Sequence, residues 1–388
     1  MLQEPIAITA LSSLSSLGKN STEVWNNYLQ TNHFLQLQSF GNAVEFAAPL
    51  SLEASQLIAE IRNSDSKYKS LDPSVLMAIW TSRQAVKQAN WQNKSDFGIN
   101  FGSSRGATTL FESHFQEFLE TGKAQTLASP STTLGNISSW VAHDLQSVGP
   151  ELSHSITCST GLHAVLNGIA WLRAGMADAF LVGGSEAPLT SFTIAQMKAM
   201  KIYASKSPTD FPCRAFDFTK TKNSMVLGEG AAAVCLELGK KTNALAYITE
   251  IGYATEILQH SVSVSAEAEC FKKSMKMALK NTAPEKVDAI VMHAPGTIKG
   301  DTSEYKAIQH VFGESLPLLT TNKWKTGHTF ASSGLLNMEL GLLMMQHNQF
   351  IGVPFVEQQV QTRPIKTVLI NSVGFGGNAV SILMKLDV

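Results

Sequence analysis

The chain contains four cysteines, and one of them, Cys158, lies in a segment typical of a catalytic nucleophile. The stretch His154–Thr157 predicts a β-strand, and the pattern over Leu162–Ala174 predicts a helix. Cys158 falls at the turn between them, where the partial positive charge of a helix N-terminus favours the thiolate. Free N–H groups at such a terminus can also bind an oxyanion. The alternative interpretation is a small, buried apolar cysteine.

The other cysteines predict no metal site and no disulfide framework, because none has CxxC spacing. Cys213, Cys235 and Cys270 lack the strand, turn and helix setting, and the run AAAVCLEL predicts a core position for Cys235. Reduced thiols are typical of the cytoplasm. The N-terminal segment lacks the basic region of a secretory signal, and no apolar run approaches the ~20 residues of a membrane helix. We therefore expect a cytoplasmic protein without a membrane segment.

The elements that must position Cys158 follow from the alternation of short apolar runs with longer helical patterns, which predicts an α/β fold. With 388 residues, 44% of them hydrophobic and 16% charged, the chain can bury a large core. Its formal net charge of -1 gives no electrostatic footprint for nucleic acid. Residues 30–70 and 200–225 are predicted to be irregular, and a weak boundary is predicted at Gly239–Asn243. The predicted strands are Ile6–Leu11, Phe97–Phe101, His154–Thr157, Ala179–Val182, Ala231–Leu238, Ala246–Tyr253, Ala289–His293, Thr367–Val373 and Val380–Leu386, and the predicted helices are Ser21–Leu29, Pro73–Ala89, Ala107–Glu120, Leu162–Ala174, Ala266–Lys280, Thr302–Phe312 and Ser333–Gln346.

A set of motifs in one order gives the chain a family resemblance. They are IAITALSSLSSLGKNSTEVWNNYLQ, TCSTGLHAV, ADAFLVGGSEAPLT, RAFDF, MVLGEGAAAVCLE, two histidine segments and NSVGFGGNA. Nearly end to end, the chain resembles the β-ketoacyl-(acyl carrier protein) synthases, condensing enzymes of the thiolase fold. The resemblance implies a duplicated, five-layered α-β-α-β-α fold. It places the nucleophilic cysteine in an N-terminal half, residues 1–240, and two catalytic histidines in a C-terminal half, residues 241–388.

The first histidine segment reads HAPGTIKGD where the family has HGTxTxxGD. Anchoring the comparison on Gly300–Asp301 places His293 on the family's first catalytic histidine without a deletion. Thr297 then matches the second family threonine, which contacts the pantetheine arm. Pro295 replaces the first threonine, so one contact with that arm is lost. Without the resemblance, a histidine after the apolar run AIVM is more often a core residue.

The second histidine segment, NKWKTGHTFASSG, matches the family pattern KxxxGH. It places Lys323 and His328 on the conserved pair. The alternative interpretation of Lys323 is a solvated loop lysine. An acidic residue that the family often has in the next helix falls on Asn337, and Glu339 two residues later is a possible substitute.

The segment NSVGFGGNA resembles the glycine-rich gating loop of the family. By resemblance, the backbone N–H groups of Phe375 and Cys158 form the oxyanion hole, the Phe375 ring gates the acyl pocket, and Gly376 belongs to the substrate-binding loop. Glycines around Phe375 let the backbone approach a ligand closely. The alternative interpretation is a tight turn between two strands.

Arg105, in FGSSRGATT, stands where the family generally has a small or apolar residue near the acyl tunnel. One interpretation is a guanidinium that binds a substrate carboxylate or shapes a polar pocket. The other is a structural ion pair, with Glu112 or with a partner subunit.

The resemblance implies a decarboxylative condensation of an acyl thioester, held on Cys158, with a malonyl thioester. The implied partner is acyl carrier protein, which supplies substrates on its phosphopantetheine, and no metal or redox cofactor is expected. A homodimer is expected, with a heterodimer as the alternative. The departures at Arg105, Pro295 and Asn337 favour a specialised polyene, pigment or polyketide pathway.

Three other functions fit the fold. A non-catalytic chain-length factor usually lacks the cysteine. A thiolase carries a second catalytic cysteine near its C-terminus, whereas no cysteine follows Cys270 here. A structural or binding protein is excluded only by assay.

Overall fold

The computed structural model describes residues 4–206, 210–257, 265–357 and 359–388. Its core is a ten-stranded sheet with the order β11-β10-β12-β13-β9-β1-β8-β6-β4-β5. The strands of the first half are β1 (Ile6–Ser15), β4 (Gly98–Gly102), β5 (Glu151–His154), β6 (Ala179–Glu186) and β8 (Gly230–Leu238). Those of the second half are β9 (Ala246–Thr255), β10 (Ala289–Val291), β11 (Leu318–Thr320), β12 (Thr367–Gly374) and β13 (Asn378–Lys385).

The two halves of the sheet repeat one topology. The order β5-β4-β6-β8-β1 in the first half corresponds to β11-β10-β12-β13-β9 in the second. In each half the first three strands are mutually parallel and the last two pair antiparallel. The halves meet through β1 and β9, which pair antiparallel with Ile6 opposite Ile248. The expected duplication is therefore visible in the order and direction of the strands.

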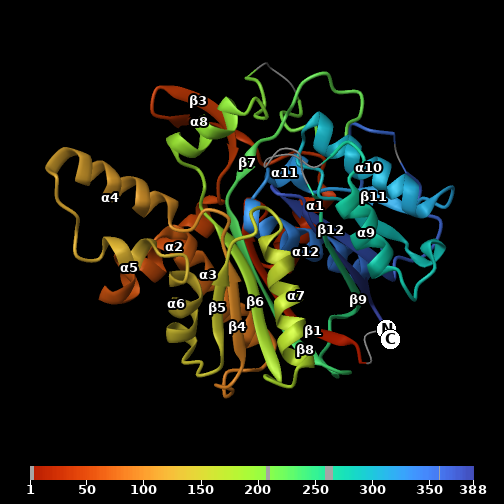
Figure 1. Cartoon of the computed structure of the whole chain (residues 1–388), viewed down its shortest axis with the longest axis horizontal. Helices are drawn as coiled ribbons and strands as arrows, with labels where there is room; N and C mark the ends of the chain where they lie inside the picture. The colour runs from red at the N-terminus through yellow and green to blue at the C-terminus, as the bar shows by residue number, and fades with distance from the viewer. Residues whose placement is uncertain (1–3, 207–209, 258–264, 358) are drawn as a thin grey trace.

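Helices complete five layers, as expected (Figure 1). Helices α7 (Thr160–Arg173) and α12 (Ser333–His347) pack on each other and contact strands of both halves. Helices α3 (Pro73–Gln88) and α6 (Asn136–Leu145) cover the outer face of the first half. On the outer face of the second half, α9 (Glu269–Ala278) contacts β9 and β13, and α10 (Ile298–Phe312) packs on α9. The central helix α12 is buried from Ser333 to Met345, as its nearly uniform apolar sequence requires.

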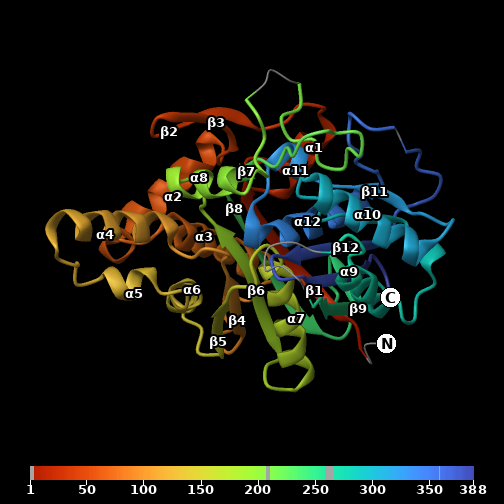
Figure 2. The ribbon, with the colours of Figure 1, turned by 45° about the horizontal axis from the view of Figure 1, so that its top comes forward.

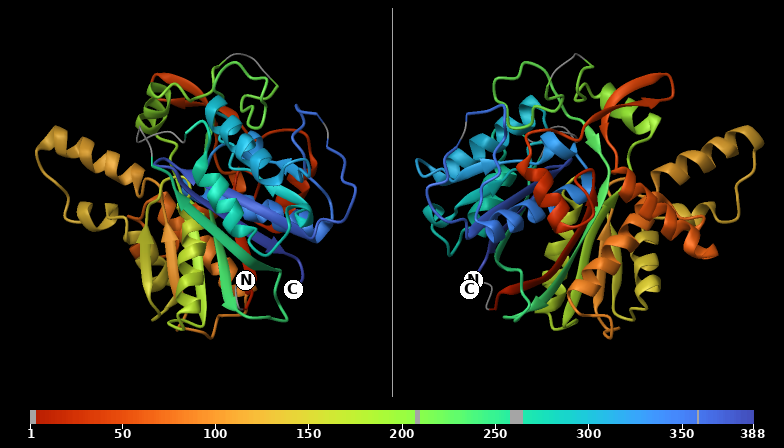
Figure 3. Two further views of the ribbon diagram at one scale, coloured as in Figure 1. Left: turned by 45° about the vertical axis from the view of Figure 1, so that its right-hand side comes forward. Right: turned by 180° about the vertical axis from the view of Figure 1, so that it is seen from behind.

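Smaller elements lie above one end of the sheet (Figure 2). A second sheet contains β2 (Gln36–Phe40), β3 (Ala43–Ala48) and β7 (Leu227–Gly228). The other helices are α1 (Ser21–Leu29), α2 (Leu52–Ser64), α4 (Thr108–Thr121), α5 (Ala128–Thr132), α8 (Ser191–Ala199) and α11 (Lys323–Thr326), with short 3-10 turns at Ser66–Tyr68, Pro284–Lys286 and Phe330–Ser332. Helices α4 and α5 form an arm that projects from the body of the molecule (Figure 3).

Several predicted boundaries were wrong. Residues 30–70, predicted to be irregular, contain β2, β3 and α2. The two strands of this hairpin are joined by Gly41 and Asn42, a two-residue hairpin signal that the sequence interpretation overlooked. Strand β5 ends at His154, where a strand over His154–Thr157 was predicted. Helix α10 begins at Ile298 rather than Thr302, because the Thr297 hydroxyl caps it by accepting from the Gly300 N–H.

Candidate active site

Cys158 lies at the turn between β5 and α7, as predicted, and only 5% of it is exposed. The turn is fixed by Thr160, whose Oγ1 accepts from the Ile156 N–H at 2.8 Å and donates to the Thr157 carbonyl at 2.6 Å. Thr157, just before the cysteine, has a φ of +46°, a conformation that costs a non-glycine residue energy and that is found at functional sites. The local fold therefore holds the thiol in one fixed position at the start of α7.

Burial works against the thiolate that the helix N-terminus was expected to favour at Cys158. Burial raises the pKa of the Cys158 thiol to about 12, and the Glu186 carboxylate raises it further, while Lys323 opposes the shift. Desolvation therefore opposes the effect of the partial charge at the helix terminus. The thiol is protonated at neutral pH, so it must lose its proton as it reacts.

His293 and His328 lie together, with their ring centroids 5.2 Å apart and their planes at 87°. His293 follows the end of β10, and His328 follows α11. Burial lowers the pKa of His328 to about 3, with a further contribution from the positive charge of Lys323. The pKa of His293 lies well below its ordinary value because of burial, His328 and Lys323. Both imidazoles are therefore neutral at physiological pH.

The ring nitrogens of this pair are poised for a ligand. The Nδ1 atom of His293 and both nitrogens of His328 are buried without a hydrogen-bond partner within the described chain. Buried polar groups in native proteins are nearly always paired, and an unpaired group marks a place for substrate or water. The two sequence-predicted histidines are thus brought together with free hydrogen-bonding capacity.

Lys323 is fully buried, so its interpretation as a solvated loop lysine is wrong. Its Nζ donates to Asn337 Oδ1 at 3.2 Å, and Asn337 Nδ2 donates to the Met292 carbonyl at 3.0 Å. Burial lowers the pKa of Lys323 to about 8, against the opposing effect of Glu304. Glu339 does not take the place of the missing acid, because it accepts instead from Ser13 Oγ at 2.6 Å.

The turn that carries His293 is held by two buried carboxylates on α10 that the sequence interpretation did not select. Glu304 accepts from the N–H groups of His293 and Ala294 at 2.9 and 2.8 Å. Asp301 accepts from the N–H of Gly296 at 3.0 Å. The intervening Pro295 has no N–H, so every donor of this turn is paired. The sequence feature that could have revealed these roles is the spacing of Asp301 and Glu304, which places them one helical turn apart on α10.

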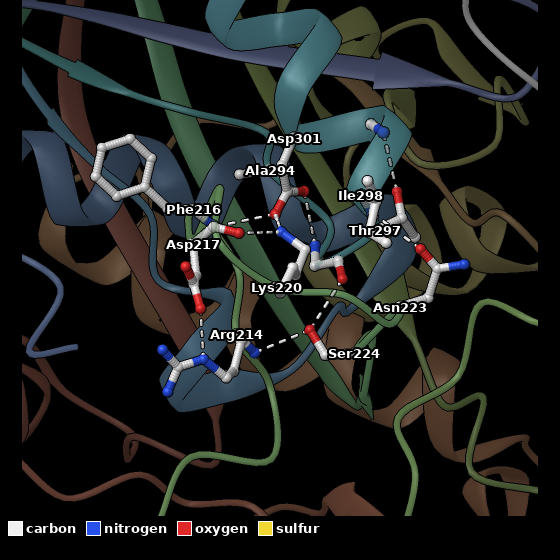
Figure 4. Close-up of polar contacts among 12 residues, drawn as sticks. Arg214, Phe216, Asp217, Lys220, Asn223, Ser224, Ala294, Thr297, Ile298 and Asp301 are labelled. Atoms are coloured by element: carbon white, nitrogen blue, oxygen red, sulfur yellow. Dashed lines mark hydrogen bonds and ion pairs between the residues drawn. The ribbon is translucent and has the colours of Figure 1, made fainter. Parts of the chain in front are cut away.

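Asp301 also ties this turn to the segment after Cys213 (Figure 4). Its Oδ2 lies 2.6 Å from Lys220 Nζ in a buried ion pair and accepts from the Phe216 N–H at 3.0 Å. Ser224 Oγ donates to the Gly296 carbonyl at 2.9 Å, on the other side of the turn. The network fixes the position of the loop between β10 and α10, and thereby of His293.

The predicted gating loop contacts the nucleophile turn. Ser372 Oγ in β12 donates to the Cys158 carbonyl at 3.3 Å, and Thr157 Oγ1 approaches the Phe375 carbonyl at 3.5 Å. Phe375 is partly exposed, and Gly376 has a φ of +95°, which favours glycine. Thr297, the predicted pantetheine contact, caps α10 by accepting from the Gly300 N–H at 3.1 Å. The loop is therefore placed to contact a group on Cys158.

Arg105 does not form the expected ion pair with Glu112. Its Nη2 donates to Gln196 Oε1 on α8, while Glu112 accepts from Thr190 Oγ1 at 2.7 Å. Arg105 is partly buried, and its Nε has no partner among the described residues.

The remaining cysteines are free thiols, and Cys235 is buried in β8, as predicted. Cys213 is buried near Lys323 and raises the pKa of that lysine, a proximity that the sequence did not reveal. Across residues 4–206, 210–257, 265–357 and 359–388, no group of three or more His, Cys, Asp or Glu side chains could hold a metal ion. In the same ranges, every helix is too short or too polar to span a bilayer.

Comparison with known proteins identifies two family domains in the chain. Residues 3–242 match the β-ketoacyl synthase N-terminal domain, and residues 245–354 match the β-ketoacyl synthase C-terminal domain. The chain is 28% identical over 411 residues to the 3-oxoacyl-(acyl-carrier-protein) synthase 2 of Coxiella burnetii, with 97% of each chain covered. It is 25% identical over 413 residues to the enzyme of the same name from Staphylococcus aureus strain COL, with 98% of each covered.

Solved structures share the fold. A β-ketoacyl synthase from Burkholderia phymatum has a TM-score of 0.84 at 19% identity, with 99% of each chain covered. A type II polyketide ketosynthase in complex with its acyl-carrier protein has a TM-score of 0.83 at 20% identity, covering 98% of this chain and 99% of that one. These two matches agree with the duplicated thiolase-like topology, and the domain matches extend over most of the sequence. The chain therefore belongs to the β-ketoacyl synthase family of condensing acyltransferases.

Proposed function

We propose that this chain catalyses the decarboxylative condensation of an acyl thioester with malonyl-acyl carrier protein, with Cys158 as the acyl acceptor. The observation that supports this most is the pair of neutral histidines with three buried ring nitrogens free, which share the influence of Lys323 with Cys158. Neutral imidazoles can donate hydrogen bonds to a developing enolate without adding a full charge.

In the first half-reaction, the Cys158 sulfur attacks the carbonyl carbon of the acyl thioester. The thiol gives up its proton as the new C–S bond forms, and a neutral imidazole with a free nitrogen is suited to accept it. The carrier's thiolate leaves and is protonated. Backbone N–H groups of Cys158 and Phe375 would hold the oxyanion, consistent with the contact between their two segments.

In the second half-reaction, malonyl thioester loses carbon dioxide as the bond to its carboxylate carbon breaks. The electrons move into an enolate, whose oxygen would accept hydrogen bonds from His293 and His328. The enolate carbon then attacks the acyl carbonyl, and Cys158 leaves as a thiolate that takes up a proton. Burial and the positive charge of Lys323 both lower the pKa of the two histidines, and the same charge would stabilise the developing enolate.

The test is a reconstituted assay with acyl and malonyl carrier proteins that follows carbon dioxide release and the β-ketoacyl product. His293→Ala and His328→Ala should each abolish decarboxylation, because each removes a donor to the enolate oxygen. His310→Ala, an exposed histidine on α10, is the matched control and should retain activity. Full decarboxylation by His293→Ala would remove that histidine from the mechanism.

We further propose that the chain works as a dimer with a ketosynthase-like chain, either a second copy or a degenerate partner. The solved relatives include a ketosynthase in complex with its chain length factor. On the α4 arm of this chain, Phe111, Phe115, Phe118 and Leu119 are exposed and share one helical face. Phe115→Glu should shift the mass measured by light scattering towards that of a monomer. An unchanged mass would exclude this face from the interface.

The alternative of a non-catalytic chain-length factor is less compatible with the site. Cys158 and both histidines are present, and His293 is held by Glu304 and Asp301 in a fully paired turn. A polyketide, polyene or pigment pathway remains our proposal for the biological context, because Arg105, Pro295 and Asn337 depart from the family pattern.

A further inference from the structure

The loop that carries Arg105 contacts Glu186, a buried residue that also influences Cys158. It runs from the end of β4 to the start of α4 and wraps around the Glu186 carboxylate, which accepts from the N–H groups of Ser104 and Arg105 at 2.7 and 3.1 Å. The same carboxylate accepts from the Ala331 N–H at 3.3 Å and raises the pKa of the Cys158 thiol. Glu186 therefore contacts the Arg105 loop and also influences the pKa of the Cys158 thiol.

The side chain of Arg105 reaches the helix that lines Cys158. Its Nη2 donates to Gln196 on α8. Ile194 and Met197, on the same helix, pack in one apolar cluster with Cys158. The guanidinium thus contacts a helix that supplies part of the apolar cluster around Cys158.

The charge of Arg105 has no counter-ion among the residues that the structure describes. No ion pair joins it to a carboxylate within the described ranges, and Glu112 is engaged by Thr190. Its partner is a neutral amide, and its Nε is buried with no partner in the described part of the chain. A partly buried guanidinium is stable when it is paired with an anion, and it prefers planar, bidentate oxygen acceptors. The structure therefore contains a binding group for an anion that residues 4–206, 210–257, 265–357 and 359–388 do not supply.

We propose that Arg105 determines acyl specificity by binding a carboxylate at the far end of the acyl group carried on Cys158. This inference rests on the proposed condensing function. The free Nε and the remaining donors of the guanidinium would pair with the two carboxylate oxygens, while Gln196 fixes the orientation of the group. Acyl chains that end in a methyl group leave this charge unpaired and are disfavoured.

The experiment compares two acyl carrier proteins of equal chain length, one loaded with octanoyl and one with the corresponding ω-carboxyacyl group. We measure kcat/KM for condensation with malonyl carrier protein in the wild type, Arg105→Leu and Arg105→Lys. The wild type should favour the ω-carboxyacyl substrate by at least about tenfold, the value expected of a charged hydrogen bond. Arg105→Leu should abolish or reverse this preference, and Arg105→Lys should retain part of it.

The outcomes separate the inference from the function on which it rests. A wild type that condenses both substrates equally well overturns the role of Arg105 and leaves the condensing activity standing. A wild type that condenses neither, and forms no acyl-Cys158, overturns both. An Arg105→Leu variant that dissociates in light scattering but keeps the wild-type preference assigns Arg105 to a partner carboxylate and also overturns the inference. Arg105→Gln, which is polar and neutral, replaces Arg105→Leu if that variant does not fold.

Discussion

Removing Lys220 should destabilise the protein far more than removing an exposed lysine with a similar ion pair. Lys220 Nζ lies 2.6 Å from Asp301 Oδ2, and the two side chains are 5% and 0% exposed. At an effective dielectric constant of about 20, two charges at that distance attract by about 6 kcal/mol. Asp301 keeps hydrogen bonds from Phe216 and Gly296, which partly offset the loss. For Lys220→Met we therefore expect a loss of about 3–5 kcal/mol in the free energy of unfolding.

The loss of stability in Lys220→Met should depend on pH. Burial raises the pKa of Asp301, and Lys220 opposes the rise, so the Lys220→Met variant should bind a proton at Asp301 at a higher pH than the wild type. The variant should show its largest loss of stability above the pKa of its Asp301, where the carboxylate is charged and lacks the Lys220 cation. This loss shrinks as the pH falls through that pKa, because a protonated Asp301 no longer needs a cation.

The assay is urea denaturation of the wild type and variant at a series of pH values. The matched control is Lys198→Met, which removes an ion pair with Glu45 from a lysine that is 45% exposed. That control should lose less than about 1 kcal/mol. A Lys220→Met variant no less stable than the control, or with a deficit independent of pH, would refute this account of the network.

Three further changes test other parts of the structure. Gly376→Ala should cost about 1–3 kcal/mol in urea denaturation and slow acylation of Cys158, because Gly376 has a φ of +95° beside the gate. Lys325→Met should cost about 3 kcal/mol, since Lys325 Nζ donates to three backbone carbonyls in the last turn of α1 and just after it; a smaller loss than in Lys198→Met would contradict this. Lys323 has a pKa of about 8, so its charge is present below that pH and lost above it. Malonyl decarboxylation should therefore decline above pH 8. In Lys323→Met, the decarboxylation rate should no longer show this decline between neutral and alkaline pH.

The sequence predicted the parts of the fold whose local pattern is strong. Largely apolar runs such as Ala231–Leu238 and Thr367–Val373 become buried strands, since a strand covered on both faces is rich in apolar residues. The duplicated sheet followed from the family resemblance, since the two halves share a strand order without a sequence repeat that the eye can detect. Short polar strands such as β2 carry little periodicity, so the hairpin was missed.

The site was predicted less completely than the fold. Family motifs selected Cys158, His293, His328 and Lys323, and the structure brings the histidines and the lysine together in a buried region. The roles of Glu304 and Asp301 depend on where α10 begins, which the sequence interpretation placed four residues too late. The pKa of Cys158 depends on burial by distant segments, which no local pattern contains.

The proposed mechanism depends most directly on acyl transfer to Cys158. Intact mass spectrometry after incubation with an acyl carrier protein, followed by peptide mapping, measures this transfer. We predict one acyl adduct on the wild type, none on Cys158→Ala, and an undiminished adduct on Cys213→Ala, which removes the other buried thiol near Lys323. An adduct that persists in Cys158→Ala, or that maps to Cys213, would contradict the central claim.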